Sequence, residues 1–347
     1  MLEQSSKLIT FIDLAGHQKY LKTTIFGLTG YKPHFALLVV AANMGVVNTT
    51  REHLGLAMAL EVPIFVAITK ADLVSQAALE RILRQLECLV KGPGCNRIPV
   101  RITCKDDAIS TARNFNEEPV VIPLFVLSSV TGENLDLLIE FLNVLPALQS
   151  HHEQLQLMQE YAEFRIDEVF KINCVGYVAA GLLLRGTIRE NEDMILGPMP
   201  DGEFIPVRIE SIHRNKTPCR IVQAGQAASL SIGQLEQAEV FMRKGMAIVH
   251  PSVSPKACVR FEAEIFLLYH PVLYVCEGFQ ATVHIGNVCQ TAVIECIEKT
   301  QRCLRLNDSA KVTFRFLKYP EYIRRDARVL IREGRTKGIG HVIRILD

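Results

Sequence analysis

Three short polar segments of this sequence each follow an apolar, strand-like stretch. They are residues 13–17 (DLAGH), 69–72 (TKAD) and 128–134 (SSVTGEN). Open α/β sheets bind ligands at the carboxyl ends of their strands, so segments in this position are expected to line one site. Their carboxylates, hydroxyl groups, lysine ammonium and turn N–H groups supply the donors and acceptors that a polar heterocycle needs.

The second segment has the side chains needed to select guanine. The Asp72 carboxylate can accept hydrogen bonds from guanine N1–H and the N2 amino group, which adenine does not offer. The stem of Lys70 can lie over the plane of the base. Thr69 precedes them with a hydroxyl group, which makes only part of the hydrogen bonds that an amide would make there. A solvated loop that happens to carry a lysine and an aspartate is the alternative.

The third segment is a turn between a strand and a helix. Here the Ser129 backbone N–H can donate to guanine O6, and the Ser128 hydroxyl can orient Asp72. We assign Val130 to the same base-binding turn. The alternative is an ordinary helix start, with Thr131 as the N-cap.

The first segment suggests phosphate chemistry. Asp13 is predicted to hold Mg²⁺ through a water molecule, and the Gly16 N–H to contact a γ-phosphate. His17 would orient the attacking water and is the candidate catalytic residue. Taken alone, the segment also fits a plain strand-to-loop turn. All three segments in order, each after a strand, indicate a guanine-nucleotide site.

The phosphate loop of such sites has no counterpart in the sequence. None of the 347 residues form the pattern G-x-x-x-x-G-K-[ST], whose backbone cradles phosphates. Losing four or five of its contacts, each worth roughly 1.5–3 kcal/mol, removes on the order of 6–12 kcal/mol. Micromolar to nanomolar binding amounts to about 8–12 kcal/mol in total. We therefore expect GTP, GDP and Mg²⁺ to bind weakly or not at all, and hydrolysis to be impaired.

The first 148 residues alternate strand-like and helix-like stretches, which predicts a parallel sheet covered by helices. The predicted strands are residues 8–14, 36–42, 64–69 and 120–127. The predicted helices are residues 50–61, 75–90 and 132–145, beginning near Thr50 and Ser75. Residues 92–119 carry Gly, Pro, Asn and paired acids, and are predicted to be an irregular surface insertion.

In the rest of the chain the spacing of the apolar residues changes. Residues 149–161 are a predicted linker. After it, short strands separated by turn residues predict two small β-barrels, over residues 162–254 and 255–347. The expected fold class is therefore α/β plus all-β: an incomplete P-loop GTPase-type α/β domain (residues 1–148) followed by two small β-barrels.

Composition excludes several classes of protein. A net charge of +1 argues against a DNA-binding protein or any globally basic nucleic-acid binder. The ten cysteines are scattered without a C-x-x-C pair, so a disulfide framework or zinc site is not expected. The sequence has neither a secretory signal pattern nor an apolar run long enough to span a membrane. A monomeric, cytoplasmic protein is expected.

One local stretch is basic. Residues 318–344 hold eight Lys or Arg residues against three acids. The candidate RNA contacts within it are Arg324, Arg325, Arg335 and Lys337. A solvated barrel face held by ion pairs explains the same pattern, and the sequence does not decide between the two.

The motifs resemble those of the elongation factor Tu and elongation factor 1-alpha superfamily of translational GTPases. The resemblance to the GTP-binding domain runs through residues 8–72, and residues 163–249 and 260–346 are similar to the second and third domains. The details LAGH (14–17), YLKTT (20–24), KDD (105–107) and TGENLD (131–136) resemble the branch of GTP-binding proteins 1 and 2. This resemblance implies GTP or GDP with Mg²⁺ as ligands, and the ribosome, tRNA or RNA-surveillance proteins as partners.

The resemblance also implies an N-terminally truncated member of the family. In the family a further strand lies between those matching residues 8–14 and 36–42, so these two either pair directly or leave an exposed edge, and residues 1–148 should be the least stable part. Whether the chain is an active enzyme stays open. The alternatives are a non-catalytic module that binds the ribosome, RNA or protein partners through its barrels, and an elongation factor that delivers charged tRNA.

Overall fold

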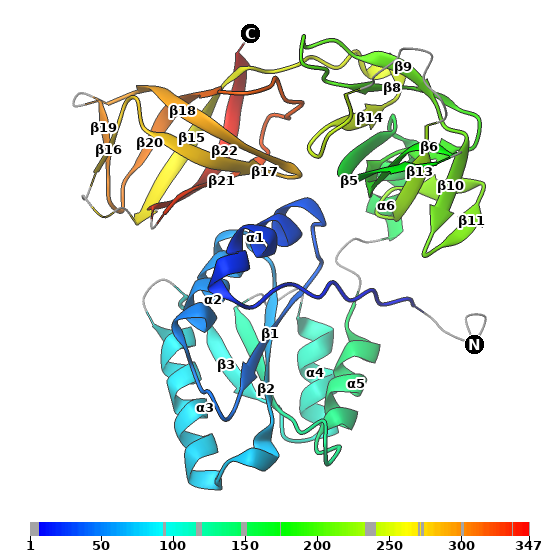
Figure 1. The fold of residues 1–347 in the computed structure, drawn as a ribbon. Helices are drawn as coiled ribbons and strands as arrows, with labels where there is room; N and C mark the ends of the chain where they lie inside the picture. The colour runs from blue at the N-terminus through cyan, green and yellow to red at the C-terminus, as the bar shows by residue number, and fades with distance from the viewer. Residues whose placement is uncertain are drawn as a thin grey trace. The chain divides into compact units, whose positions relative to one another are not determined.

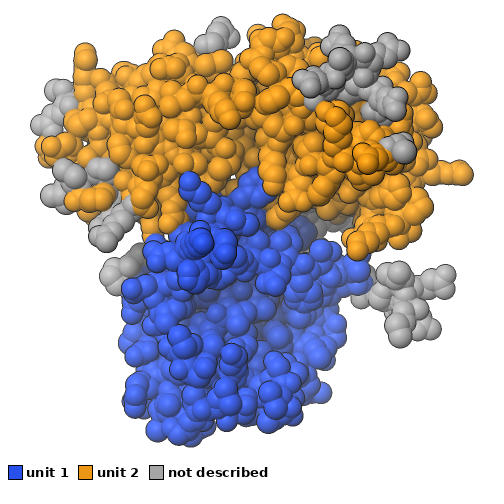
Figure 2. Space-filling model, in the orientation of Figure 1, with its two compact units in different colours: residues 1–28, 33–148 blue, residues 29–32, 149–347 orange. Residues whose placement is uncertain are grey.

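The computed structural model describes residues 7–92, 95–115, 120–146, 151–173, 175–232, 241–269, 271, 274–299, 302–334 and 336–346. These form two compact units (Figure 2). Unit 1 comprises residues 1–28 and 33–148, and unit 2 comprises residues 29–32 and 149–347. Each unit is described by itself.

Unit 1 is built on a four-stranded parallel sheet (Figure 1). Its order is β1 (Ala36–Ala41), β2 (Ile64–Thr69), β4 (Val121–Val126) and β3 (Ile98–Arg101). β2 pairs in parallel with β1 on one side and with β4 on the other. Because parallel strands need helical crossovers, this sheet confirms the α/β half of the predicted fold.

Helices cover both faces of this sheet. α2 (Asn48–Ala59) and α3 (Gln76–Lys91) pack on one face, and α4 (Lys105–Asn114) and α5 (Leu135–Val144) on the other. Along β2 the side chains alternate, so that Val66 faces α2 and α3 while Phe65 faces α4 and α5. α3 begins as predicted, since the Ser75 hydroxyl accepts the Ala78 N–H. α2 begins earlier than predicted, at Asn48.

The predicted strand over residues 8–14 is wrong. Residues 7–16 have no regular secondary structure, and Phe11 is 69% exposed. They lead through a 3-10 turn (Gln18–Tyr20) into α1 (Leu21–Gly30). Among the described residues no strand pairs with the outer edge of β1, so this stretch does not form the inter-strand hydrogen bonds that define a strand. Of the two expected outcomes, direct pairing does not occur, and the outer edge of β1 has no strand partner among the described residues.

The predicted irregular insertion is also wrong, because it contains β3 and α4. One of its paired acids, Asp107, caps a helix. The Asp107 carboxylate accepts the backbone N–H groups of Thr103 and Cys104 at 3.1 and 3.2 Å, and so satisfies donors at the start of α4. These bonds hold the pKa of Asp107 below its usual value.

In the main segment of unit 2, α6 (His151–Gln159) lies inside the predicted linker and is followed by an all-β region. Eight strands form one antiparallel sheet in the order β11-β10-β13-β6-β5-β14-β8-β9, and β12 pairs with β7. The strands are β5 (Glu163–Ile172), β6 (Gly176–Arg185), β7 (Thr187–Arg189), β8 (Asp193–Gly197), β9 (Ile205–Arg208), β10 (Ser211–Arg214), β11 (Thr217–Cys219), β12 (Ile221–Gln223), β13 (Ala227–Ser231) and β14 (Ala247–Val249). They enclose one apolar core that includes Phe164, Leu183 and Met246.

The last part of unit 2 is a closed six-stranded barrel in the order β15-β20-β18-β17-β21-β22. Its strands are β15 (Arg260–Tyr269), β17 (Gln280–Ile285), β18 (Val288–Ile297), β20 (Ser309–Phe316), β21 (Arg328–Glu333) and β22 (Thr336–Leu346). β16 (Tyr274–Cys276) and β19 (Cys303–Arg305) form a separate ribbon. The fold class predicted from the sequence is confirmed.

One disulfide corrects the expectation drawn from the cysteines. Cys276 and Cys303 stand directly opposite each other in the β16–β19 ribbon and are bonded. They lie 27 residues apart. Cysteine spacing alone could not identify this pair, because strand register brings the two residues together.

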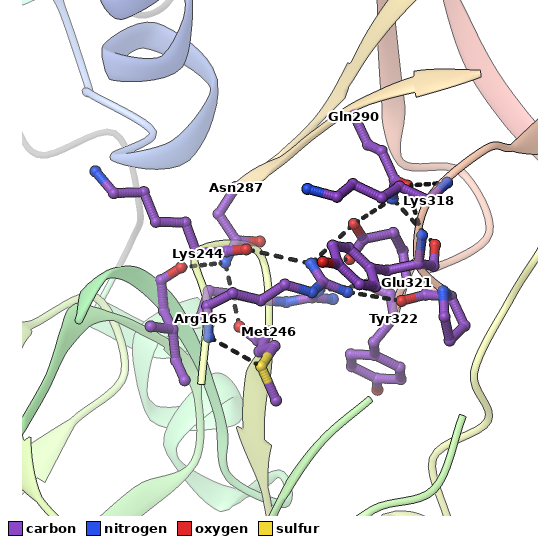
Figure 3. A network of polar contacts seen from close by, with 12 residues as sticks. Arg165, Lys244, Met246, Asn287, Gln290, Lys318, Glu321 and Tyr322 are labelled. Atoms are coloured by element: carbon purple, nitrogen blue, oxygen red, sulfur yellow. Dashed lines mark hydrogen bonds and ion pairs between the residues drawn. The ribbon is translucent and has the colours of Figure 1, made fainter. Parts of the chain in front are cut away.

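A buried polar network joins the two β regions of unit 2 (Figure 3). Arg243 donates to both carboxylate oxygens of Glu321 at 2.9 Å, and its guanidinium lies 4.9 Å from the Tyr319 ring centre. The Gln290 amide donates to the same carboxylate at 2.6 Å. Glu321 is only 2% exposed. Its charge is thus balanced by a partner from the other β region.

Arg165 makes a second link in this network. It donates to the Tyr322 carbonyl at 2.5 Å, and its guanidinium lies 4.5 Å from the Tyr322 ring centre. It also pairs with the fully buried Glu163, as does Arg324. In the low-dielectric interior these ion pairs and hydrogen bonds are strong, but removing one partner leaves a buried charge unpaired, which is strongly destabilising.

Arg243→Ala should destabilise unit 2 at neutral pH by about 3–5 kcal/mol, because it leaves a buried carboxylate without its cation. Burial raises the pKa of Glu321 and Arg243 lowers it. Without Arg243 the folded pKa lies further above the unfolded value, so the penalty should grow as pH rises through that pKa and shrink as pH falls below it. Thermal and urea unfolding from pH 4 to 8 measures this.

Arg315→Ala is the matched control. It removes the same charge from an exposed pair with Glu295, and should cost about 1 kcal/mol or less. Equal costs for both variants, or a cost for Arg243→Ala that does not depend on pH, would contradict this account of the network.

Candidate nucleotide site

Parallel pairing of β2 and β4 places the second and third polar segments side by side. Ile68 stands opposite Val126 in the register, and the Leu127 N–H donates to the Ile68 carbonyl at 2.8 Å. One step further, the Ala71 N–H donates to the Leu127 carbonyl at 3.2 Å. The loops that follow the two strands therefore start from fixed, adjacent positions.

Asp72 and Ser128 are directly bonded. The Ser128 hydroxyl donates to Asp72 Oδ1 at 2.6 Å and accepts the Thr131 N–H at 3.2 Å. Ser128 is completely buried, whereas Asp72 is exposed. The contact inferred from the sequence is thus present, and it fixes one carboxylate oxygen while the other faces away from this bond.

The turn after Ser128 presents backbone donors to solvent. The Ser128 N–H donates to the Glu133 carbonyl and the Gly132 N–H to the Ser128 carbonyl, which closes the turn. Ser129 and Val130 lie exposed at its tip, and within the described part of the chain the Ser129 N–H has no protein acceptor. The unpaired Ser129 N–H can donate a hydrogen bond and the oriented Asp72 carboxylate can accept hydrogen bonds, so together they can recognise the edge of a heterocycle.

The sequence interpretation missed Asn134, which anchors this turn. Its side-chain amide donates to the Val126 carbonyl at 3.0 Å, and its backbone is left-handed with φ of 56°. α5 starts only after it, at Leu135, so Thr131 is not the N-cap predicted for this helix. An Asn immediately before an apolar helical run is the signal in the sequence, since Asn tolerates the left-handed conformation.

Lys70 has an unusual backbone. It is exposed and left-handed, with φ of 58°, a conformation that is uncommon for residues other than glycine, Asn and Asp. It follows the half-buried Thr69, whose carbonyl accepts the Ala42 N–H at 2.8 Å, and precedes the 3-10 turn Ala71–Leu73. Such strain occurs often at ligand sites.

The first polar segment lies in the irregular stretch before α1. Asp13, Gly16 and His17 are all exposed. The loop is tied to α1 by the Thr24 hydroxyl, which donates to the Ala15 carbonyl at 2.6 Å. His17 Nδ1 accepts the Lys19 N–H at 3.1 Å, which leaves Nε2 facing away from this bond. No hydrogen bond within the described residues joins this loop to the Asp72–Ser128 pair.

In this loop, the carboxylate that could bind Mg²⁺ is that of Asp13. In the described residues no group of three or more His, Cys, Asp or Glu side chains is placed to hold a metal ion. Mg²⁺ keeps several waters and is held in proteins by one or two carboxylates together with substrate phosphates. Asp13 therefore fits a partial, water-mediated role that depends on a bound phosphate.

The candidate RNA contacts differ in their surroundings. Arg324 is paired with the buried Glu163 and so already serves the network of unit 2. Arg325 is exposed, Lys337 is half-buried on β22, and Arg335 lies outside the described residues. Their role in binding RNA stays a prediction.

Ser128→Ala should destabilise unit 1 by about 1–3 kcal/mol, because it removes a buried acceptor from Thr131 and a donor from Asp72. Ser129→Ala is the matched control, an exposed neighbour whose change should cost about 0.5 kcal/mol or less. Urea unfolding monitored by amide exchange of β2 and β4 measures both. A Ser128→Ala variant as stable as the control would contradict the structural role of this hydroxyl.

Comparison with known proteins places this geometry in context. Residues 1–151 match the elongation factor Tu GTP binding domain. The chain is 52% identical over 340 residues to GTP-binding protein 2 of Mus musculus, covering 98% of this chain and 56% of that protein. It is 47% identical over 345 residues to GTP-binding protein 1 of Xenopus laevis, covering 99% and 51%. The chain thus spans about half the length of these curated relatives.

The fold is shared with a solved structure. The apo form of translation elongation factor SelB from Methanococcus maripaludis superposes with a TM-score of 0.71 at 16% identity, over 97% of this chain and 70% of that one. Among the described residues, no helix is long and apolar enough to cross a membrane. Sequence and fold agree with the resemblance predicted above: the chain belongs to the elongation factor Tu-like superfamily of translational GTPases.

Proposed function

We propose that this chain recognises the guanine base of a nucleotide and acts as part of a translational GTPase associated with the ribosome. The observation that carries the proposal is the 2.6 Å hydrogen bond from the buried Ser128 hydroxyl to the exposed Asp72 carboxylate. It orients a base-reading carboxylate next to a free backbone donor. The similarity to GTP-binding protein 2 supports the same assignment.

Base recognition follows from the chemistry of these groups. Asp72 accepts from guanine N1–H and the N2 amino group, while the Ser129 N–H donates to O6. Adenine has an amino group in place of O6 and lacks the N1 proton, so it would leave both protein groups unpaired. Unpaired polar groups in a binding site cost more than a missing contact alone.

Phosphate binding and hydrolysis have less support from the residues of this chain. Asp13 and His17 supply a carboxylate and an imidazole, but the sequence has no phosphate-loop motif to hold charge beside them. We therefore propose that the base contributes most of the nucleotide affinity of this chain and that hydrolysis is slow. A cytoplasmic role in translation or RNA surveillance belongs to the same proposal.

The second candidate is a non-catalytic interaction module. It is favoured by unit 2, whose closed barrel and polar network lie within residues 149–347; among the described residues, neither includes a candidate nucleotide-binding residue. In this case the β regions would bind a ribosomal or protein partner, and nucleotide would not change that binding.

Asp72→Asn should weaken guanosine binding by about 10- to 100-fold, the loss of a hydrogen bond to a charged group. It should instead favour xanthosine, because the amide donates to the xanthine C2 oxygen. Titrations of both nucleosides monitored by NMR or calorimetry measure this change in preference.

Asp136→Asn makes the same change at an exposed carboxylate on α5, and should bind guanosine like the unmodified chain. If both variants bound guanosine equally, or if nucleoside binding were absent from the unmodified chain, the base-recognition proposal would fail. The interaction-module candidate would then stand.

A further inference from the structure

A groove of about 590 Å³ lies between α2 and α3 of unit 1. Three arginines line it, Arg51 from α2 and Arg81 and Arg84 from α3. Gln85 adds an amide, and the remaining lining residues are Val46, Cys88, Leu89 and Gly92. None of these residues belongs to the candidate nucleotide site. Every charged side chain of the lining is thus an arginine, and Val46, Cys88 and Leu89 add an apolar surface beside them.

The sequence of α3 separates its charges onto different faces. Leu79, Ile82, Leu83, Leu86 and Val90 are buried against the sheet. Glu80 and Glu87, seven residues apart, lie together on a second face, where both accept from Arg101 of β3 at 3.1 and 2.6 Å. The remaining face of α3 borders the groove, and the helical period places four residues on it: Arg81, Arg84, Gln85 and Cys88.

The acids of α3 are consequently not available to the arginines. Both glutamates already pair with Arg101. Arg51, Arg81 and Arg84 are exposed, and none has an ion-pair partner among the described residues. Like charges three residues apart on a helix are mildly destabilising. The groove therefore holds a concentrated positive charge that the described structure does not neutralise.

We propose that this α2–α3 groove binds the phosphate backbone of RNA. Guanidinium groups match phosphate oxygens with paired donors, and Gln85 adds a further donor. The groove is open rather than enclosed, so a polymer can pass through it. Val46, Cys88 and Leu89 also give the groove an apolar surface, so an acidic peptide is the competing ligand. The three guanidinium groups, unpaired among the described residues, favour phosphate, whose oxygens they bind with paired donors.

The test uses the full chain and a fluorescein-labelled single-stranded RNA 12-mer, with anisotropy measured from 50 to 200 mM salt. Three phosphate contacts predict a log–log salt slope of about −2, since each contributes roughly 0.7 for single strands. Affinity should therefore fall about 20-fold over this range. The double variant Arg81→Ala/Arg84→Ala should retain a slope of only about −0.7.

Arg113→Ala is the matched control, because Arg113 is exposed on α4, on the opposite face of the sheet. It should keep both the affinity and the slope of the unmodified chain, and all variants should show the same thermal unfolding. Three results would overturn the proposal: no RNA binding, equal losses in Arg113→Ala, or arginine-dependent binding of a poly-glutamate peptide in place of RNA. Guanosine binding should be unchanged throughout, so this outcome is separate from that of the nucleotide proposal.

Discussion

The parallel pairing of β2 with β4 is the constraint on which the candidate site depends. It brings two loops, 56 residues apart in the sequence, close enough for Ser128 to donate to Asp72. The pairing is itself enforced by burial, because the apolar sides of helices cover β2 on both faces of the sheet. A polar site at the end of such a strand follows from the open α/β architecture, since side chains there leave the core while the backbone is still held.

Unit 2 is held by paired charges as well as by its apolar cores. Two buried glutamates, Glu163 and Glu321, each bind arginine. The arginines also contact backbone carbonyls and tyrosine rings across the two β regions, and Figure 3 shows the part of this network around Glu321. Such pairs add little net stability over an apolar contact, but they penalise any arrangement that separates them. We infer that they fix how the two β regions of this unit meet. This role explains why Arg324, a candidate RNA contact, pairs within the protein instead.

The sequence predicted those features whose signals are local. The periodicity of β2, the cap at Ser75 and the contact between Ser128 and Asp72 could all be read from spacing and residue type. Features that depend on distant partners could not be. Residues 8–14 look like a strand but pair with none that the structure describes, and Cys276 meets Cys303 only through strand register. The charge on the α2–α3 groove likewise became visible only once Arg101 was seen to occupy the acids of α3.

The central claim is that Asp72 and Ser128 select guanine within this chain. The most direct measurement is a pair of NMR titrations of the chain with guanosine and with adenosine, following the amides of residues 69–72 and 128–132. The account predicts saturable shifts at these amides with guanosine, and affinity for adenosine at least about tenfold weaker, as the loss of a charged hydrogen bond requires. Equal shifts with both nucleosides, or shifts confined to other parts of the chain, would contradict it.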